Sequence, residues 1–233
     1  MKKAIIPSLL IALGLLALGL AIRSGIVRVS DNSRVVTVRG LSEREVKANK
    51  VTWPISYTLV GNDLPSLYSQ MQTNNNVIIK YLTSNGLTAE EYSTGAGAVT
   101  DNQADRYSSN APLYRYNITG TVTVTSEQVD LVRRLINNQG EIIKQGIAVS
   151  PDNWNNRTIY EYTELNSIKP DMIADATKNA REAANKFAAD SGSKIGKIKT
   201  AQQGQFSIED RDPYTPFIKK VRVVTYIDYF IED

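Results

Sequence analysis

The stretch YNITGTVTV, residues 116–124, carries the clearest strand pattern in this chain. Its apolar positions alternate with polar ones: Tyr116, Ile118, Val122 and Val124 against Asn117, Thr119, Thr121 and Thr123. Successive side chains of a β-strand point to opposite faces of a sheet, so this alternation predicts a strand that buries one face. A strand in a sheet is therefore expected here.

A second alternating stretch lies upstream. Its apolar face comprises Val51, Trp53, Ile55, Tyr57 and Leu59. Pro54 falls on the other face and has no N–H to donate, which predicts that the strand lies at a sheet edge or carries a bulge there. A shorter β-branched run, Arg34 to Arg39, is expected to form a strand that ends at Gly40.

Each alternating stretch is followed by a segment in which apolar residues recur at helical spacing. Asp63 is the expected N-cap and Gly86 the expected end of a first helix. Its predicted buried face is Leu67, Met71, Ile78 and Leu82. Thr125 and Gln128 have the spacing of a capping box, which predicts a second helix ending before Gly140. The buried face of this helix is expected to be Val129, Val132, Leu135 and Ile136.

The second half of the chain contains a long alanine-rich helix, expected from Pro170 to Asp190. Its predicted buried face is Ile173, Ala176, Ala180, Ala183, Ala184 and Phe187. Glu182 and Lys186 are expected to form an ion pair on the solvent side. Gly192 is expected to end the helix, since glycine adopts the left-handed conformation that helix ends require.

Further strands are expected around these helices. Their ranges are Ile142 to Val149, Arg157 to Tyr162, Lys194 to Gln203 and Lys219 to Ile231. The last range is largely apolar on both faces, which predicts a central position in its sheet. Strands and helices together predict an α+β fold.

The N-terminus combines two lysines with an apolar run. Met1-Lys2-Lys3 is followed by uncharged residues from Ala4 to Ile22. A helix of about 19 residues is roughly 28 Å long, enough to cross a membrane. Three interpretations stay open: an uncleaved membrane anchor, a cleaved secretory signal, and a helix buried in the folded protein.

The first two interpretations place the rest of the chain in a bacterial cell envelope. Lys2 and Lys3 favour a cytoplasmic start, so the chain would be anchored in the inner membrane and face the periplasm, or be secreted into it. The expected organisation is an anchor or signal at residues 1–23, a linker at 24–33 and one domain at 34–233.

The amino-acid composition excludes several classes of function. The chain contains no Cys and no His, which excludes the usual zinc sites and the most common general base. The net charge is +3 and basic residues are interspersed with acidic ones, so no nucleic-acid surface is indicated. We expect no cofactor, no metal and no nucleic-acid partner.

Two short motifs resemble binding loops and are expected to be solvated. Gly95-Ala96-Gly97 lacks the third glycine and the following helix of a nucleotide-binding loop. Asp101 and Asp105 could offer oxygen ligands to calcium, but the glycine turn and the bidentate Glu of a calcium loop are missing.

Carboxylate clusters and serines could serve a hydrolase. Glu90-Glu91 and Glu209-Asp210 with Asp212 would suit a glycosidase only if two carboxylates flanked a sugar bond, and solvated turns are the simpler interpretation. No SxxK motif or nucleophile elbow singles out a Ser–Lys pair. The expectation is therefore a chain without catalytic residues.

Aromatic residues indicate both a core and a contact surface. Trp53 lies on the apolar face of its strand and is expected to be core. Trp154, Tyr107 and Tyr214 form a possible interaction surface, because exposed aromatics are enriched at interfaces. Trp154 could instead cover one end of the core. Most of the twelve tyrosines are expected in strands and core.

Four longer segments show a family likeness in their order and spacing: VVTVRGLSEREVKANKVTWPISY at 35–57, YRYNITGTVTVTSEQVDLVRRLI at 114–136, DATKNAREAANKFAADSGSKIGKI at 175–198 and VRVVTYIDYFI at 221–231. Together they resemble the SIMPL-domain family of bacterial envelope proteins. The resemblance implies two βαβ-type halves with helices packed on antiparallel or mixed sheets. It implies no enzymatic activity. Some family members form ring- or channel-like oligomers, and members are associated with stress tolerance.

The resemblance and the missing chemistry lead to one expected function. We expect a non-enzymatic cell-envelope protein that acts through self-assembly or partner binding, as a homo-oligomer, in envelope stress tolerance. Two other classes stay open. A module binding a small lipid or peptide would need an apolar pocket lined by tyrosine. A carboxylate or Ser–Lys hydrolase would need convergent polar side chains in a cleft.

Overall fold

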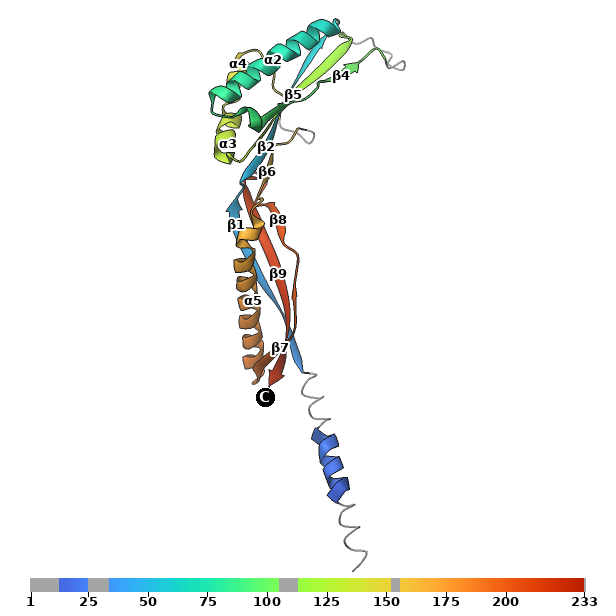
Figure 1. Cartoon of the computed structure of the whole chain (residues 1–233), viewed down its shortest axis with the longest axis vertical. Helices are drawn as coiled ribbons and strands as arrows, with labels where there is room; N and C mark the ends of the chain where they lie inside the picture. Colours follow the sequence, from blue (N-terminus) through green and yellow to red (C-terminus); the bar gives the residue numbers. More distant parts are fainter. Residues whose placement is uncertain (1–12, 25–33, 105–112, 152–155, 233) are drawn as a thin grey trace, which may run out of the picture. The chain divides into compact units, whose positions relative to one another are not determined.

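A computed structural model describes residues 13–24, 34–104, 113–151 and 156–232 (Figure 1). Helices and two antiparallel sheets make up these residues, which confirms the α+β class. The chain divides into two compact units. Unit 1 comprises Met1–Arg44, Asn166–Ile208 and Val221–Asp233, and unit 2 comprises Glu45–Leu165 and Glu209–Lys220. The predicted anchor, linker and domain boundaries stay predictions.

The sheet of unit 2 is built on the two alternating stretches. β2 (Lys50–Gly61) and β5 (Tyr116–Ser126) pair antiparallel from Val51↔Ser126 to Gly61↔Tyr116. β3 (Tyr92–Thr94) and β4 (Ala98–Asp101) pair with β5, and β6 (Ile159–Glu161) pairs with β2. The predicted inward face of β2 is confirmed, because Val51, Trp53, Ile55 and Tyr57 are all buried.

Three helices contribute to the core of unit 2: α2 (Leu64–Ser84), α3 (Val129–Asn137) and α4 (Gly140–Lys144). Asp63 is the N-cap of α2, as predicted, and its Oδ2 accepts from the Ser66 amide at 2.9 Å. The helical side chains in the core include Leu67, Met71, Ile78, Leu82, Val129, Val132, Leu135 and Ile142. A 3₁₀ turn, η1 (Ala89–Glu91), precedes β3.

β2 lies between β5 and β6, and Pro54 pairs in register with Thr123 of β5, so the prediction of an edge strand or a bulge at Pro54 is wrong. The missing N–H of Pro54 is tolerated because its nitrogen faces the side opposite β5. The Ser150 amide donates to the Ser56 carbonyl at 2.7 Å, so the backbone N–H and C=O of Ser56 point away from β5. The backbone nitrogen and carbonyl of Pro54, two residues earlier, face the same side. In the described part of the chain, β6 pairs with β2 only from Lys50 to Thr52, so Pro54 pairs with no residue of β6.

Two local predictions in unit 2 are wrong. Thr125 lies within β5 rather than capping α3, and the Gln128 amide donates instead to Ser126 Oγ at 2.9 Å. The strand expected from Ile142 to Val149 is replaced by α4 and a single bridge between Val149 and Tyr57. Burial of Ile142 in the core outweighs the β-propensity of this β-branched segment.

The sheet of unit 1 has β9 (Ile218–Glu232) between β1 (Val35–Lys47) and β7 (Lys194–Gln203), and β8 (Ser207–Asp210) also pairs with β9. The predicted central position of β9 is thus confirmed. One face of β9 is buried, namely Val221, Val223, Thr225, Ile227 and Tyr229.

α5 (Leu165–Asp190) covers that buried face with a stripe of one methionine and four alanines. The stripe is Met172, Ala176, Ala180, Ala184 and Ala188. The prediction of Phe187 in this face is wrong, since its side chain is 62% exposed. The outer ion pair joins Lys178 to Glu182, not Glu182 to Lys186. Gly192 ends the helix region with φ +72°, as expected.

β1 continues through Gly40 rather than ending there. A β-carbon built on Gly40 would lie 1.8 Å from the Ala176 carbonyl oxygen of α5. Glycine is therefore required by the close approach of a helix backbone, not by a turn.

Residues 13–24 are helical. Among the residues that the structure describes, no helix is both long and apolar enough to cross a membrane. The first part of the apolar run, residues 4–12, lies outside the described residues.

Candidate functional site

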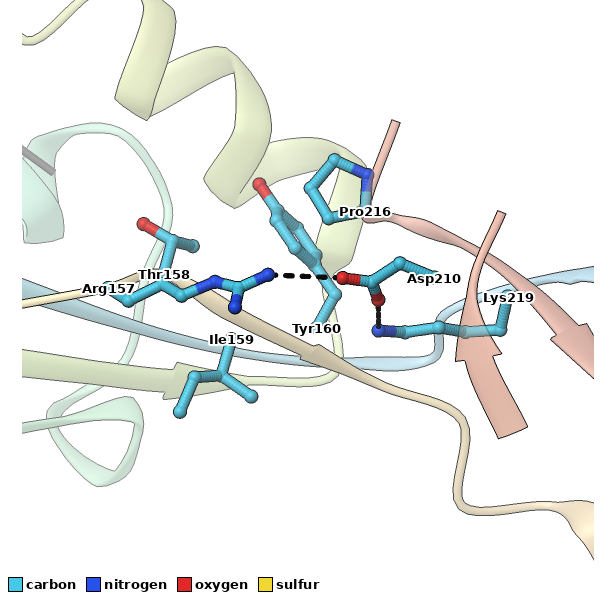
Figure 2. Close-up of a pocket in the computed structure, with 7 residues that line it drawn as sticks. All are labelled: Arg157, Thr158, Ile159, Tyr160, Asp210, Pro216 and Lys219. Atoms are coloured by element: carbon cyan, nitrogen blue, oxygen red, sulfur yellow. Dashed lines mark hydrogen bonds and ion pairs between the residues drawn. The ribbon is translucent and has the colours of Figure 1, made fainter. Parts of the chain in front are cut away.

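A pocket of about 390 Å³ opens in unit 2 (Figure 2). Its lining comprises Arg157, Thr158, Ile159, Tyr160, Asp210, Pro216 and Lys219. These residues come from β6 and the segment before it, the end of β8, and the loop and strand start that follow. Segments about 50 residues apart in the sequence thus form one site.

Asp210 is the centre of the polar side of this pocket. Lys219 Nζ donates to Asp210 Oδ1, and Arg157 Nη2 donates to Asp210 Oδ2 at 3.1 Å, as Figure 2 shows. Lys219 is only 8% exposed, whereas the Arg157 side chain is 55% exposed. Burying an ammonium group is costly unless a carboxylate compensates it, which accounts for the position of Asp210.

Two cations share one carboxylate here, so the three side chains carry a net positive charge. The remaining wall is largely apolar. Ile159 is about half exposed, and Tyr160 packs edge-on against the Phe217 ring at 6.2 Å. The pocket therefore combines a cationic end with an apolar side.

A tight turn beside the pocket is organised by Asp212. Its Oδ1 accepts from the amides of Tyr214 and Thr215 at 2.8 Å each, and its Oδ2 accepts from the Thr215 hydroxyl and from Arg211 Nε. The Thr215 hydroxyl and Arg211 together lower the Asp212 pKa from 3.8 to about 2. The turn presents Tyr214 at 91% exposure, and its predicted role in contacts stays a prediction.

Unit 1 offers a second candidate surface, which we call the open face. It is the side of the β1-β9-β7 sheet opposite α5, and it carries Val35, Arg39, Leu41, Val224, Tyr226 and Phe230. In the described part of unit 1 these side chains are exposed or half-buried. Antiparallel sheets commonly leave one face to solvent, but such a face is usually polar.

Charged and hydroxyl groups on the open face are already paired with each other. The Arg39 guanidinium lies over the Tyr226 ring at 5.2 Å, and Arg222 Nε lies 3.5 Å from Glu43 Oε1. Asp228 accepts from the hydroxyls of Thr200 and Thr37, which lower its pKa. These contacts connect β1, β9 and β7 across the open face.

The two edge strands of the same sheet, β7 and β1, are less suited to binding a partner than the open face is. β7 contains two register shifts against β9 and three lysines, Lys194, Lys197 and Lys199. Bulges and lysines are features that prevent uncontrolled strand addition. On β1, the Leu41 carbonyl accepts from Asn179 Nδ2 of α5 at 2.8 Å, so part of that edge is also occupied.

The binding-loop motifs have structural roles where they are described. Gly97 has φ +81°, and a β-carbon there would lie 2.6 Å from Met71 Sδ, so it serves a tight packing turn. Asp101 makes a two-point contact with Arg115 at 2.9 to 3.2 Å. Asp105 lies outside the described residues, as do Tyr107 and Trp154.

The members of the predicted carboxylate clusters are exposed or accept hydrogen bonds within the fold. Glu91 accepts from Ser126 Oγ and from the Thr88 amide, which lower its pKa, and Glu90 is exposed. Among the described residues, no group of three metal-ligating side chains is present.

Sequence reasoning did not single out Lys219 or Arg157. A signal for Lys219 was available, because it falls in the same register as Val221 and Val223 on the strand predicted to be central. A lysine in a buried register requires a carboxylate partner. No local pattern marks Arg157, which meets Asp210 only through the fold.

A family model described as "SIMPL: Protein of unknown function (DUF541)" matches residues 36–222. No curated protein matches the chain.

Proposed function

Because the chain belongs to the SIMPL (DUF541) family, we propose that it is a non-enzymatic protein of the bacterial cell envelope that acts by associating with further copies of itself. The observation that carries this proposal is the open face of unit 1. Apolar side chains on an uncovered sheet face lose unfavourable contact with water when a second sheet packs on them.

The charge pattern of the open face suits a second copy of the same chain. The face carries both signs of charge: Arg222 lies 3.5 Å from Glu43, and Arg39 and Asp228 are further charged residues of the same face. A face with one sign of charge would repel itself, whereas this mixed face can meet its own copy without net repulsion. The bulges and lysines of β7 and the occupied carbonyl of β1 disfavour the addition of a strand at either edge. A second copy is therefore expected to pack on the open face.

The placement in the envelope is supported by the N-terminal sequence. Two lysines precede the apolar run from Ala4 to Ile22, which is the pattern of a signal or an anchor. An N-terminal attachment would also raise the local concentration of copies at a membrane, which favours weak self-association. A contribution to envelope stress tolerance belongs to the same proposal.

The hydrogen bonds that the carboxylates accept within the fold support a non-enzymatic role. Glu91, Asp101, Asp210 and Asp212 each accept from neighbouring donors within the fold. General acid–base work requires a group poised to exchange a proton with a substrate, and these groups are held in structural contacts.

Light scattering of the full chain in a mild detergent, over a range of protein concentrations, tests the proposal. We expect a mass above that of one chain, and we expect the double variant Leu41→Ser/Tyr226→Ser to return it to that of one chain. Phe187→Ser is the matched control, because it removes an exposed aromatic ring from α5 outside the open face.

A single-chain mass at every concentration would contradict self-association. An oligomer that persists in the double variant would contradict the role of the open face. Near-ultraviolet circular dichroism of each variant establishes that the fold is retained.

A further inference from the structure

We propose that the pocket around Asp210 binds a small ligand that carries a single carboxylate and an apolar branch. This inference goes beyond self-association, because it concerns unit 2 and a different chemistry. It follows from the charge, the unused donors and the shape of the pocket.

The charge of the pocket favours a monoanion. Arg157 and Lys219 both contact Asp210, so one of their two positive charges is not compensated by the carboxylate. A carboxylate ligand would complete the neutralisation. A phosphate dianion would bring a second negative charge against Asp210, which like-charge repulsion disfavours.

The donors of the pocket are only partly used. Among contacts within the described residues, Lys219 Nζ donates to Asp210 Oδ1, and Arg157 donates through Nη2. An ammonium group has three N–H donors and a guanidinium has five. Arg157, with a side chain 55% exposed, can therefore turn its free N–H groups toward an incoming carboxylate.

The volume and the walls favour a ligand with an apolar part. A pocket of about 390 Å³ is within the range of small-ligand sites. Ile159 and Pro216 are apolar members of its lining, and Figure 2 shows Ile159 close to Arg157. A branched aliphatic group would cover the exposed Ile159 side chain while the carboxylate contacts Arg157.

Nuclear magnetic resonance titration of the isotopically labelled full chain tests this binding directly. N-acetyl-leucine is the probe, N-acetyl-leucine amide is the uncharged control, and amide signals of Thr158 and Ile159 report the contact. We expect the acid to shift these signals with at least ten-fold higher affinity than the amide, because charge-assisted hydrogen bonds are lost in the control. Equal affinities would overturn the proposal.

Two substitutions move the affinity in opposite directions. Arg157→Gln is expected to weaken N-acetyl-leucine binding about ten-fold, and Arg115→Gln, a matched surface arginine paired with Asp101, is expected to leave it unchanged. Asp210→Asn is expected to strengthen binding several-fold, because it removes the competing carboxylate. Weaker binding in folded Asp210→Asn, or unaltered binding in Arg157→Gln, would overturn the proposal.

A second acid distinguishes the source of the carboxylate. 4-Methylpentanoate has the same branch and carboxylate without a peptide group. Similar affinity for both acids assigns the pocket to free organic acids, and preference for N-acetyl-leucine assigns it to the C-terminus of a peptide. Binding of neither acid at millimolar concentration contradicts the inference. If Asp210→Asn does not fold, Arg157→Gln still decides the outcome, since its side chain is largely exposed.

Discussion

Gly40 of β1 and Ala176 of α5 approach so closely that a β-carbon on Gly40 would lie 1.8 Å from the Ala176 carbonyl oxygen. The alanine stripe of α5 allows this approach, because no larger side chain separates the helix from the strand. The packing of unit 1 thus depends on small residues on both sides of one contact.

Gly40→Ala is expected to lower the free energy of unfolding by about 3 kcal/mol, because the added methyl group meets backbone atoms that cannot rotate away. Urea denaturation followed by circular dichroism measures this loss. Gly140→Ala is the matched control, since no atom lies within 4 Å of its added β-carbon. A Gly40→Ala variant as stable as the wild type would show that α5 does not pack on β1 in this way.

Trp53→Ala is expected to lower the free energy of unfolding by about 3 to 5 kcal/mol. Trp53 is 4% exposed and lies in the core of unit 2, so its removal leaves a large cavity. Phe187→Ala, which truncates an exposed ring, should change stability by no more than about 0.5 kcal/mol. Equal effects of the two substitutions in denaturant melts would contradict the assigned face of β2.

Tyr57 gives a prediction at alkaline pH. Its hydroxyl oxygen lies 2.8 Å from the Met71 carbonyl oxygen and 2.7 Å from Asn75 Oδ1, either of which can accept its one proton, and burial raises its pKa from 10.0 to about 12. The folded protein therefore holds this proton more tightly than the unfolded chain does. The stabilisation is fully present below pH 10 and is lost as the pH rises through 12.

Tyr57→Phe removes the hydroxyl, and with it the donated hydrogen bond and this titration. We expect a loss of about 1 to 2 kcal/mol at neutral pH, because the Asn75 side chain is left buried without this partner. The difference between wild type and variant should shrink from pH 10 to pH 12. Tyr214→Phe, at an exposed ring, serves as the control, and a difference that does not vary with pH would contradict burial as the cause.

Glu91 gives a prediction at acid pH. The Ser126 hydroxyl and the Thr88 amide donate to its carboxylate and lower its pKa below 4.5. A lowered pKa contributes stability that is present above the unfolded pKa and is lost as the pH falls through the folded value.

Glu91→Gln should therefore cost about 1 kcal/mol at pH 7 and much less at strongly acid pH. Glu90→Gln is the matched control, because the neighbouring carboxylate is exposed. Urea melts at pH 7 and at pH 3 measure both differences. An equal cost for the two variants at pH 7 would show that the contacts of Glu91 are not stabilising.

Much of the fold could be predicted from local patterns. The alternation in β2 and β5 identified two strands and their buried faces, and the central position of β9 followed from its two apolar faces. The predictions failed where a contact distant in the sequence decides the outcome. Phe187 has helical spacing suited to a buried face, but the close approach at Gly40 selects the alanine stripe instead.

The candidate pocket could not be predicted from any single stretch. Lys219 was marked only by its buried register, and Arg157 and Asp210 are 53 residues apart in the sequence. Spacing along a chain contains no information on which distant loop a side chain meets, because that pairing is set by the packing of whole elements.

Local patterns along the chain predicted the α+β class, the buried faces of β2 and β5 and the N-cap of α2, because periodicity and local hydrogen bonding act over a few residues. The order of longer segments indicated the family. The roles of Gly40 and Lys219, the helical form of α4 and the assembly of the Asp210 pocket arise from the three-dimensional packing of the chain. These features depend on close packing and charge compensation between segments far apart in the chain, which local patterns do not encode.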